Sequence, residues 1–156
     1  MRPSEPPPAY VVRVTLAKLE AAMAARAARD LPPAPILAAD TTVALGGRIL
    51  GKPIDRDDAI AMLAALSGRT HRVLTAVALV GRNGRRHHRL NASRVRFGRI
   101  SRGEIERYVD SGDPMDKAGS YGIQGAAGRF VRRIEGSHSG IMGLPLYETA
   151  ELLRRC

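Results

Sequence analysis

Apolar positions near the start of the chain follow a helical period. Between Ala9 and Arg29 their spacing predicts an amphipathic helix. The prolines that begin at Pro32 predict its end. The apolar face of this helix, with spacings of four, three and four residues, consists of Val12, Leu16, Leu19 and Met23.

The next segments favour two strands joined by a tight turn, and then a second helix. Ile36–Leu45 is an apolar run without helical spacing, which predicts a buried strand. Gly46-Gly47 suits a turn into a short strand at Arg48–Leu50. Asp55 is placed to cap a helix that ends near Gly68. The buried stripe of this helix consists of Ala59, Met62, Leu63 and Leu66.

A hairpin follows in the middle of the chain. Val73–Val80 has the character of a strand, and Asn83-Gly84 is a strong hairpin signal. The return strand is expected to run through about Arg86–Phe97.

The last third of the chain alternates helical, glycine-rich and strand-like segments. Ser101 and Glu104 form a capping-box pattern for a short helix. After the glycine-rich segment 112–128, we expect strands at Arg129–Ile134 and Ser139–Gly143 and a closing helix from Pro145. This order predicts one domain over residues 1–156, of the α/β or α+β class, with a mixed sheet and flanking helices.

Composition agrees with one compact domain of one or two lobes. The 156 residues are 44% hydrophobic, with no Trp and only two Phe, so aliphatic residues must build the core. No apolar run approaches the roughly 20 residues of a membrane span. The proline-rich start has no apolar segment typical of a signal peptide, and the single cysteine, Cys156, cannot form an internal disulfide. We therefore expect a cytoplasmic protein.

The formal net charge of +10 favours anionic partners. The arginines are scattered, and no aromatic residues alternate with them, so we do not expect a platform for nucleic acid. We favour a solvated, arginine-rich surface over a nucleic-acid patch, and a field that attracts polyanionic small molecules is compatible with both.

Asp40 is the first candidate for chemistry, because it is a carboxylate inside an otherwise apolar strand. A buried charge there costs several kcal/mol unless it is paired or bound to a metal. An Asp that is hydrogen-bonded to a neighbouring turn is the alternative, and the spacing does not separate the two. Thr41 and Thr42 follow Asp40 and are expected to point to opposite faces of the sheet.

Three further segments carry candidate side chains. Lys52, between Gly and Pro, is a suitable point charge for a phosphate, whereas His71 at a helix exit is expected to be structural. In the glycine-rich segment, Asp116 can bind a divalent cation, Lys117 a phosphate and Gln124 the edge of a nucleobase. A simple glycine-rich connection is the alternative interpretation of that segment.

Together these segments resemble the Maf family of nucleoside triphosphate pyrophosphatases. The matching text occurs in the family's order and covers nearly all of the chain from about Ala9. It consists of Ala39-Asp40-Thr41, Gly51-Lys52-Pro53, Leu66-Ser67-Gly68-Arg69-Thr70-His71, Asp116-Lys117-Ala118-Gly119, Tyr121-Gly122-Ile123-Gln124-Gly125 and Gly143-Leu144-Pro145-Leu146.

The resemblance implies hydrolysis of dTTP and UTP to the monophosphate and pyrophosphate, with Mg²⁺ or Mn²⁺. It makes Asp40 the proton acceptor, and the candidate metal ligands are Asp40 and, from its own chemistry, Asp116. It places Lys52 and Lys117 near the triphosphate, and it ties Thr41 and Gln124 to base selection. It also implies two lobes around a cleft and a homodimer.

Two features depart from the family pattern. His138 stands where the family more often has Tyr. The family's opening Ser-x-Ser-Pro-Arg-Arg loop, which would contact the triphosphate, has no counterpart in the sequence, so we expect an N-terminally truncated domain. A remnant that binds nucleotide or a protein partner without turnover is therefore the alternative to an active enzyme.

Overall fold

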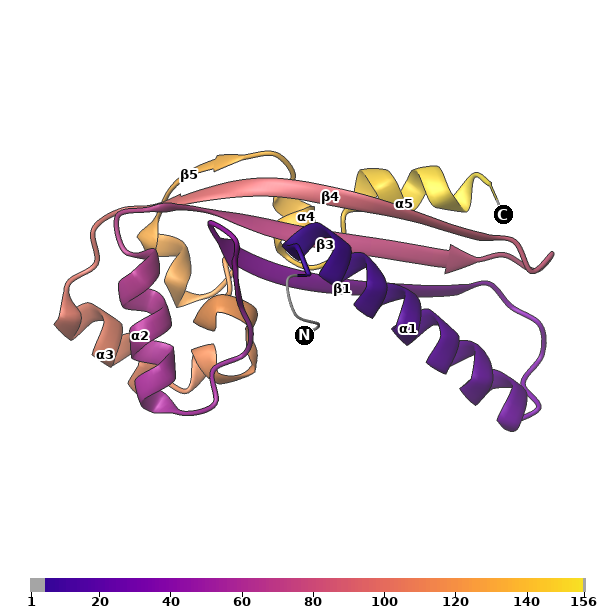
Figure 1. The fold of residues 1–156 in the computed structure, drawn as a ribbon, viewed down its shortest axis with the longest axis horizontal. Coiled ribbons are helices and arrows are strands. Elements are labelled where there is room, and N and C mark those ends of the chain that lie inside the picture. The colour runs from indigo at the N-terminus through magenta and orange to yellow at the C-terminus, as the bar shows by residue number, and fades with distance from the viewer. Residues whose placement is uncertain (1–4, 156) are drawn as a thin grey trace.

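The computed structural model describes residues 5–155 and contains one antiparallel sheet with helices on both faces (Figure 1). The strand order is β2-β1-β3-β4-β5. Of the predicted proline-rich lead-in (Pro3, Pro6, Pro7 and Pro8), Pro3 lies outside the described residues, as does Cys156, whereas Pro7 and Pro8 belong to the helix that follows. The elements are α1 (Pro7–Ala28), β1 (Ile36–Leu45), β2 (Arg48–Leu50), α2 (Arg56–Leu66), β3 (Thr70–Val80), β4 (Arg86–Phe97), α3 (Arg102–Asp110), β5 (Val131–Glu135), α4 (His138–Ile141) and α5 (Leu146–Leu153), with 3₁₀ turns η1 (Asp113–Asp116), η2 (Ala118–Ser120) and η3 (Ala126–Phe130).

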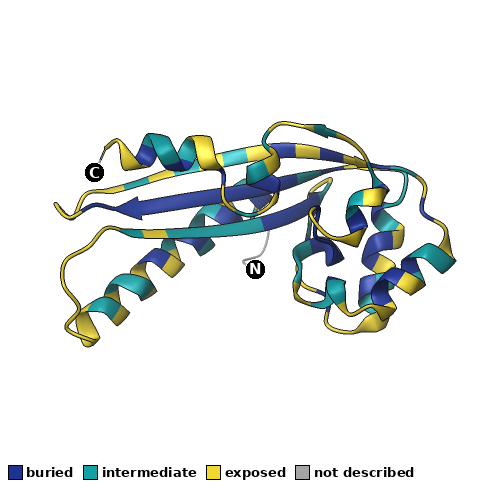
Figure 2. Cartoon of the chain, turned by 180° about the vertical axis from the view of Figure 1, so that it is seen from behind, coloured by how far each residue is buried: buried dark blue, intermediate teal, exposed yellow. Residues whose placement is uncertain are grey.

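The molecule has two lobes that share the long strands. Helix α1 covers one face of the sheet and α5 the other, as the front and back views show (Figures 1 and 2). At the other end of the strands, α2, α3 and the 3₁₀ turns enclose the largest hydrophobic core. The predicted class, a sheet with flanking helices, is therefore confirmed, but the sheet is not mixed, because all strand pairs among residues 5–155 are antiparallel.

Helix α1 packs through a slightly different stripe from the predicted one. It begins at Pro7, whose fixed φ suits the first turn of a helix. Its fully buried line runs through Val11, Thr15 and Leu19. The predicted Val12 flanks this line and packs against it from a partly buried position. No helix within the described residues is long and apolar enough to cross a membrane.

The local capping and turn signals were confirmed in detail. The Asp55 carboxylate accepts from the Asp58 amide at 2.8 Å at the start of α2. Ser101 and Glu104 form the predicted capping box of α3. Gly84 has φ of +76° in the hairpin between β3 and β4, a conformation that glycine adopts without strain.

The predicted strand at Ser139–Gly143 was wrong, because this segment forms the short helix α4. Ser137 caps α4, and its Oγ accepts from the Gly140 amide at 3.0 Å. A Cβ at Gly140 would lie 2.4 Å from Oδ1 of Asn91, so glycine lets the helix approach β4 closely. This tertiary contact and the serine cap outweigh the short apolar pattern.

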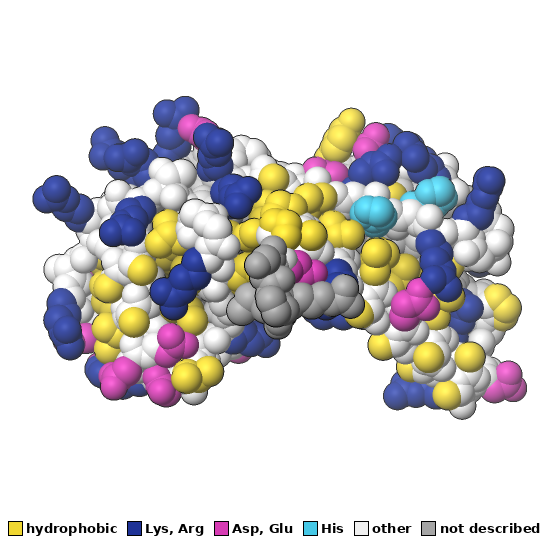
Figure 3. Space-filling view, in the orientation of Figure 1, with side chains coloured by type: hydrophobic (Ala, Val, Ile, Leu, Met, Phe, Trp, Pro, Cys, Tyr) yellow, Lys and Arg dark blue, Asp and Glu magenta, His cyan; other side chains and the backbone are white. Residues whose placement is uncertain are grey.

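Lys and Arg side chains are spread over both ends of the molecule on the face viewed in Figure 3. The two ends are joined by a narrower middle. This distribution agrees with the interpretation of the basic residues as a scattered, solvated surface.

Candidate active site

A cleft of about 250 Å³ opens between the sheet and the glycine-rich segment. It brings together side chains from five separate parts of the chain. Five of the six residues predicted for catalysis, substrate binding or metal binding line it, and the sixth, Asp40, does not. The lining residues are Thr41, Val43, Lys52, Val73, Asp116, Lys117, Ala118, Tyr121, Gly122, Ile123, Gln124, Ile141 and Met142.

Strand β1 divides its candidate residues between the two faces of the sheet. Thr41 faces the cleft, and its Oγ1 lies 2.9 Å from Oγ1 of Thr75 on β3. Asp40 faces α1, where Nζ of Lys18 contacts its Oδ1 at 2.5 Å. The Asp40 side chain is 18% exposed and is not among the residues that line the cleft. Thr42 shares the side of Asp40 and is buried, as strand alternation requires.

A backbone hydrogen bond links the segment of Lys52 to the segment of Lys117. The Gly119 amide donates to the Gly51 carbonyl at 2.9 Å. Gly119 has φ of +70°, and a Cβ there would lie 2.9 Å from Cγ1 of Val43. Only glycine fits this approach of the loop to β1, and the approach places both lysines at the cleft.

Replacing Gly119 with Ala is expected to destabilise the fold by about 2 kcal/mol, from left-handed backbone strain and contact with Val43. Gly112→Ala is the matched control, because Gly112 has φ of +78° and open space within 4 Å of its added Cβ. That control should lose only about 1 kcal/mol. Urea unfolding measures both values, and equal losses would contradict a close approach to Val43.

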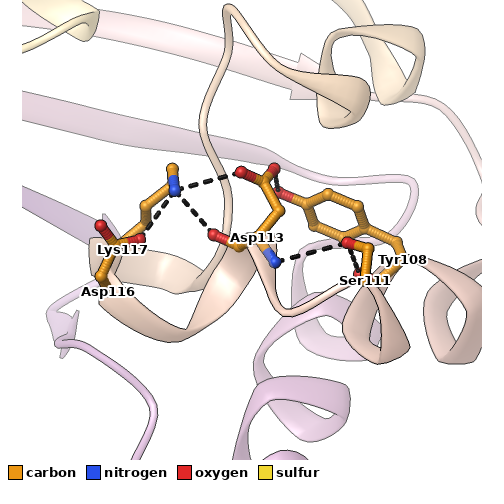
Figure 4. A network of polar contacts seen from close by, with 5 residues as sticks. All are labelled: Tyr108, Ser111, Asp113, Asp116 and Lys117. Atoms are coloured by element: carbon orange, nitrogen blue, oxygen red, sulfur yellow. Dashed lines mark hydrogen bonds and ion pairs between the residues drawn. The ribbon is translucent and has the colours of Figure 1, made fainter.

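Lys117 is held by two carboxylate residues of its own loop (Figure 4). Its Nζ donates to Oδ1 of Asp116 at 2.7 Å and to the Asp113 carbonyl at 2.7 Å, and lies 3.2 Å from Oδ1 of Asp113. Tyr108 donates to the other Asp113 oxygen at 2.7 Å. Hydrogen bonding to Lys117 lowers the pKa of Asp116, and hydrogen bonding to Asp116 raises the pKa of Lys117.

Asp113 is a functional candidate that sequence reasoning missed. Its spacing of four residues from Lys117 was the available signal, because such pairs meet on a helical turn. A Cβ at Gly122 would lie 2.9 Å from Cδ of Lys117, so this glycine leaves room for the lysine side chain. The loop therefore holds the Lys117 ammonium group at the cleft through its shape as well as through its charge.

His71 is structural, as the sequence suggested. It is 2% exposed, and its Nε2 lies 2.7 Å from the Tyr121 hydroxyl. Its ring also packs edge-on against Phe97. Burial lowers the pKa of His71 to about 4 and raises that of Tyr121. The neutral His71 thus supports Tyr121, one wall of the cleft.

One carboxylate at the cleft, Asp116, is a candidate ligand for a cation that is shared with a phosphate. Within residues 5–155 there is no group of three His, Cys, Asp or Glu that could hold a metal alone. Asp116 is an exposed carboxylate at the cleft. Mg²⁺ is commonly bound by one or two carboxylates together with substrate phosphates. Asp116 fits that arrangement.

The fold and the cleft define a class of protein: an α+β protein with a partly apolar cleft that is lined by two lysines and is suited to a small phosphate ester. Two lysines offer charge to phosphates, and the exposed Gln124 amide offers a donor and an acceptor. The sequence profile of the family described as Maf-like protein matches residues 1–156. The chain belongs to the Maf family.

Several curated relatives are similar over nearly the whole chain. A protein of Cupriavidus pinatubonensis named "dTTP/UTP pyrophosphatase" is 63% identical over 155 residues, which are 99% of this chain and 77% of that protein. A protein of the same name from Cupriavidus metallidurans is 62% identical, over 99% of this chain and 76% of that protein. One from Burkholderia pseudomallei is 58% identical, over 97% and 73% respectively.

Proposed function

We propose that this protein hydrolyses dTTP and UTP to the nucleoside monophosphate and pyrophosphate. The observation that carries this proposal is the cleft, which gathers Lys52, Lys117, Thr41 and Gln124 from distant parts of the chain. The names of the relatives support the same reaction. Phosphoryl chemistry of this kind depends mainly on positioning and charge neutralisation, which two lysines can supply.

Each residue has a proposed role in this reaction. Lys52 and Lys117 bind the phosphates, and Thr41 and Gln124 contact the base. Asp40 is the proton acceptor for the attacking water. Among residues 5–155, the outer edge of β1 is paired only where Val43–Leu45 meets β2, and the proposed role of Asp40 requires the phosphate chain to pass round the unpaired part of this edge.

A divalent cation, Mg²⁺ or Mn²⁺, is proposed as the cofactor, with Asp116 and Asp40 as its candidate ligands. Bound beside the phosphates, such an ion would neutralise charge that develops on their oxygens. The carboxylates of this chain would then orient the ion, while the lysines hold the remaining phosphate charge.

We also propose a homodimer that acts in the cytoplasm. Nucleoside triphosphates as substrates and the single cysteine support this location. An exposed apolar surface after α4 supports association, since Leu144, Leu146 and Tyr147 are 38%, 60% and 72% exposed. Light scattering at micromolar concentration should give twice the chain mass, and a monomer would contradict the dimer.

The proposed activity is tested by pyrophosphate release from a panel of nucleoside triphosphates. We expect release from dTTP and UTP with Mg²⁺ or Mn²⁺, less from other nucleotides, and a loss of activity with excess EDTA. Product analysis should give the monophosphate and pyrophosphate in equal amounts. No release from any nucleotide with either metal would contradict the proposal.

Nucleotide binding without turnover is the second candidate function. It is favoured by the placement of Asp40, which faces Lys18 and α1 and is not a cleft-lining residue. Calorimetry with dTTP and UTP separates the two candidates. Binding with no pyrophosphate release supports the binding protein, and robust turnover excludes it.

A further inference from the structure

A short chain of hydrogen bonds runs from the cleft into the protein behind it. Thr41 Oγ1, at the cleft, lies 2.9 Å from Thr75 Oγ1. The Thr75 hydroxyl in turn donates to the Gly140 carbonyl in α4 at 2.7 Å. Thr75 is 0% exposed and does not line the cleft, so it has no direct access to a ligand.

The chemistry of the three groups fixes the direction of this chain. A carbonyl only accepts, so Thr75 must be the donor toward Gly140. A hydroxyl carries a single hydrogen, so Thr75 can only accept from Thr41. The Thr41 hydroxyl therefore donates its hydrogen to Thr75, and its oxygen offers only lone pairs to a ligand in the cleft.

The surroundings of Gly140 hold the acceptor end of the chain in place. The Gly143 amide also donates to the Gly140 carbonyl, at 3.2 Å. Gly140 itself lies against Asn91, where any side chain would collide. Helix α4 cannot move the Gly140 carbonyl away from Thr75 without losing its packing against Asn91. The hydrogen bond therefore keeps the Thr75 hydroxyl in one orientation.

We infer that Thr75 is a positioning residue that makes Thr41 an obligatory hydrogen-bond acceptor, and that the cleft thereby selects a base with a ring N–H. This inference rests on the proposed function, in which Thr41 contacts the base. Uracil and thymine carry a donor at N3, whereas N3 of cytosine is an acceptor. The Gln124 amide can donate or accept, so it does not impose this choice.

The test compares kcat/KM for UTP and CTP in the wild-type protein, Thr75→Val and Thr75→Ser. Valine removes the acceptor and frees the Thr41 hydrogen to meet cytosine N3, so the UTP-to-CTP ratio should fall about tenfold. Serine retains the hydroxyl and should keep the wild-type ratio. General damage to the site would lower both activities and leave the ratio unchanged, and an unchanged ratio in Thr75→Val would overturn the inference.

A second measurement needs no variant and covers the case in which Thr75→Val fails to fold. On the wild-type protein, 3-methyl-UTP lacks the N3–H, whereas 5-methyl-UTP keeps it and carries the same added carbon. We expect 3-methyl-UTP to be at least about tenfold poorer. Equal use of the two would overturn the inference and leave the proposed activity intact. If no nucleotide is turned over, the proposed function fails. The inference is then decided by calorimetry, from the ratio of the dissociation constants of UTP and CTP and the ratio for 3-methyl-UTP and 5-methyl-UTP. If no nucleotide binds, both the proposed function and the inference are overturned.

Discussion

Asp40→Asn is expected to lower kcat for UTP by at least about 100-fold, because an amide cannot accept the proton of the attacking water. The variant should remain folded. The ion pair with Lys18 joins a side chain that is 53% exposed to one that is 18% exposed, and such pairs contribute at most about 1 kcal/mol. Steady-state pyrophosphate release and urea unfolding of the same preparation measure the two effects.

Two control variants separate chemistry from structure in this experiment. Lys18→Met breaks the same ion pair and should cost as little stability as Asp40→Asn does. Asp110→Asn removes an exposed carboxylate, paired with Arg56 at 2.8 Å, and should leave kcat unchanged. Undiminished turnover by folded Asp40→Asn would show that Asp40 is not the proton acceptor. Its role would then be structural, through the pair with Lys18.

Acidification from pH 7 to pH 4 is expected to cost about 3 kcal/mol of folding free energy through His71 alone. The ordinary pKa of 6.5 applies to the unfolded chain, whereas burial lowers the pKa of His71 to about 4 in the fold. Between pH 4 and pH 6.5, His71 is protonated in the unfolded state and neutral in the native state. Stability is therefore fully present above pH 6.5 and is lost as the pH falls toward 4.

His71→Phe should remove this part of the pH dependence, because phenylalanine does not titrate. The aromatic neighbours Phe97 and Tyr121 can receive another ring, although the Tyr121 hydroxyl loses its partner. His88→Phe is the matched control, since His88 is exposed. Urea unfolding at several pH values gives the slopes. If His71→Phe and His88→Phe keep the same slope between pH 4 and 6.5, His71 does not titrate as argued.

Local signals predicted those parts of the fold that short-range chemistry controls. The Asp55 cap, the Asn83-Gly84 turn and the Ser101 capping box are each settled by a few neighbouring residues, and each was found as expected. The strand prediction for Ser139–Gly143 was wrong because the conformation of this segment depends on Asn91, which is distant in sequence. The pattern of apolar residues along a segment does not indicate such a long-range contact.

The candidate site was predictable as a set of residues but not as an arrangement. Motif order collected Lys52, Lys117, Thr41 and Gln124, and the cleft does bring them together. Alternation along β1 already implied that Asp40 and Thr41 face opposite sides, yet only the Lys18 contact identifies the side of Asp40. Thr75 had no signal in the sequence, because its importance lies in a hydrogen bond to a carbonyl in another element.

The bond between the Gly119 amide and the Gly51 carbonyl has a consequence for motion. The two lysine-bearing segments are distant in sequence, and this bond joins them directly. Local opening of the glycine-rich segment would expose the Gly119 amide to solvent while the long strands stay paired. Its hydrogen-exchange rate therefore reports how often the two lysines separate, and a bound phosphate that bridges them should slow that rate.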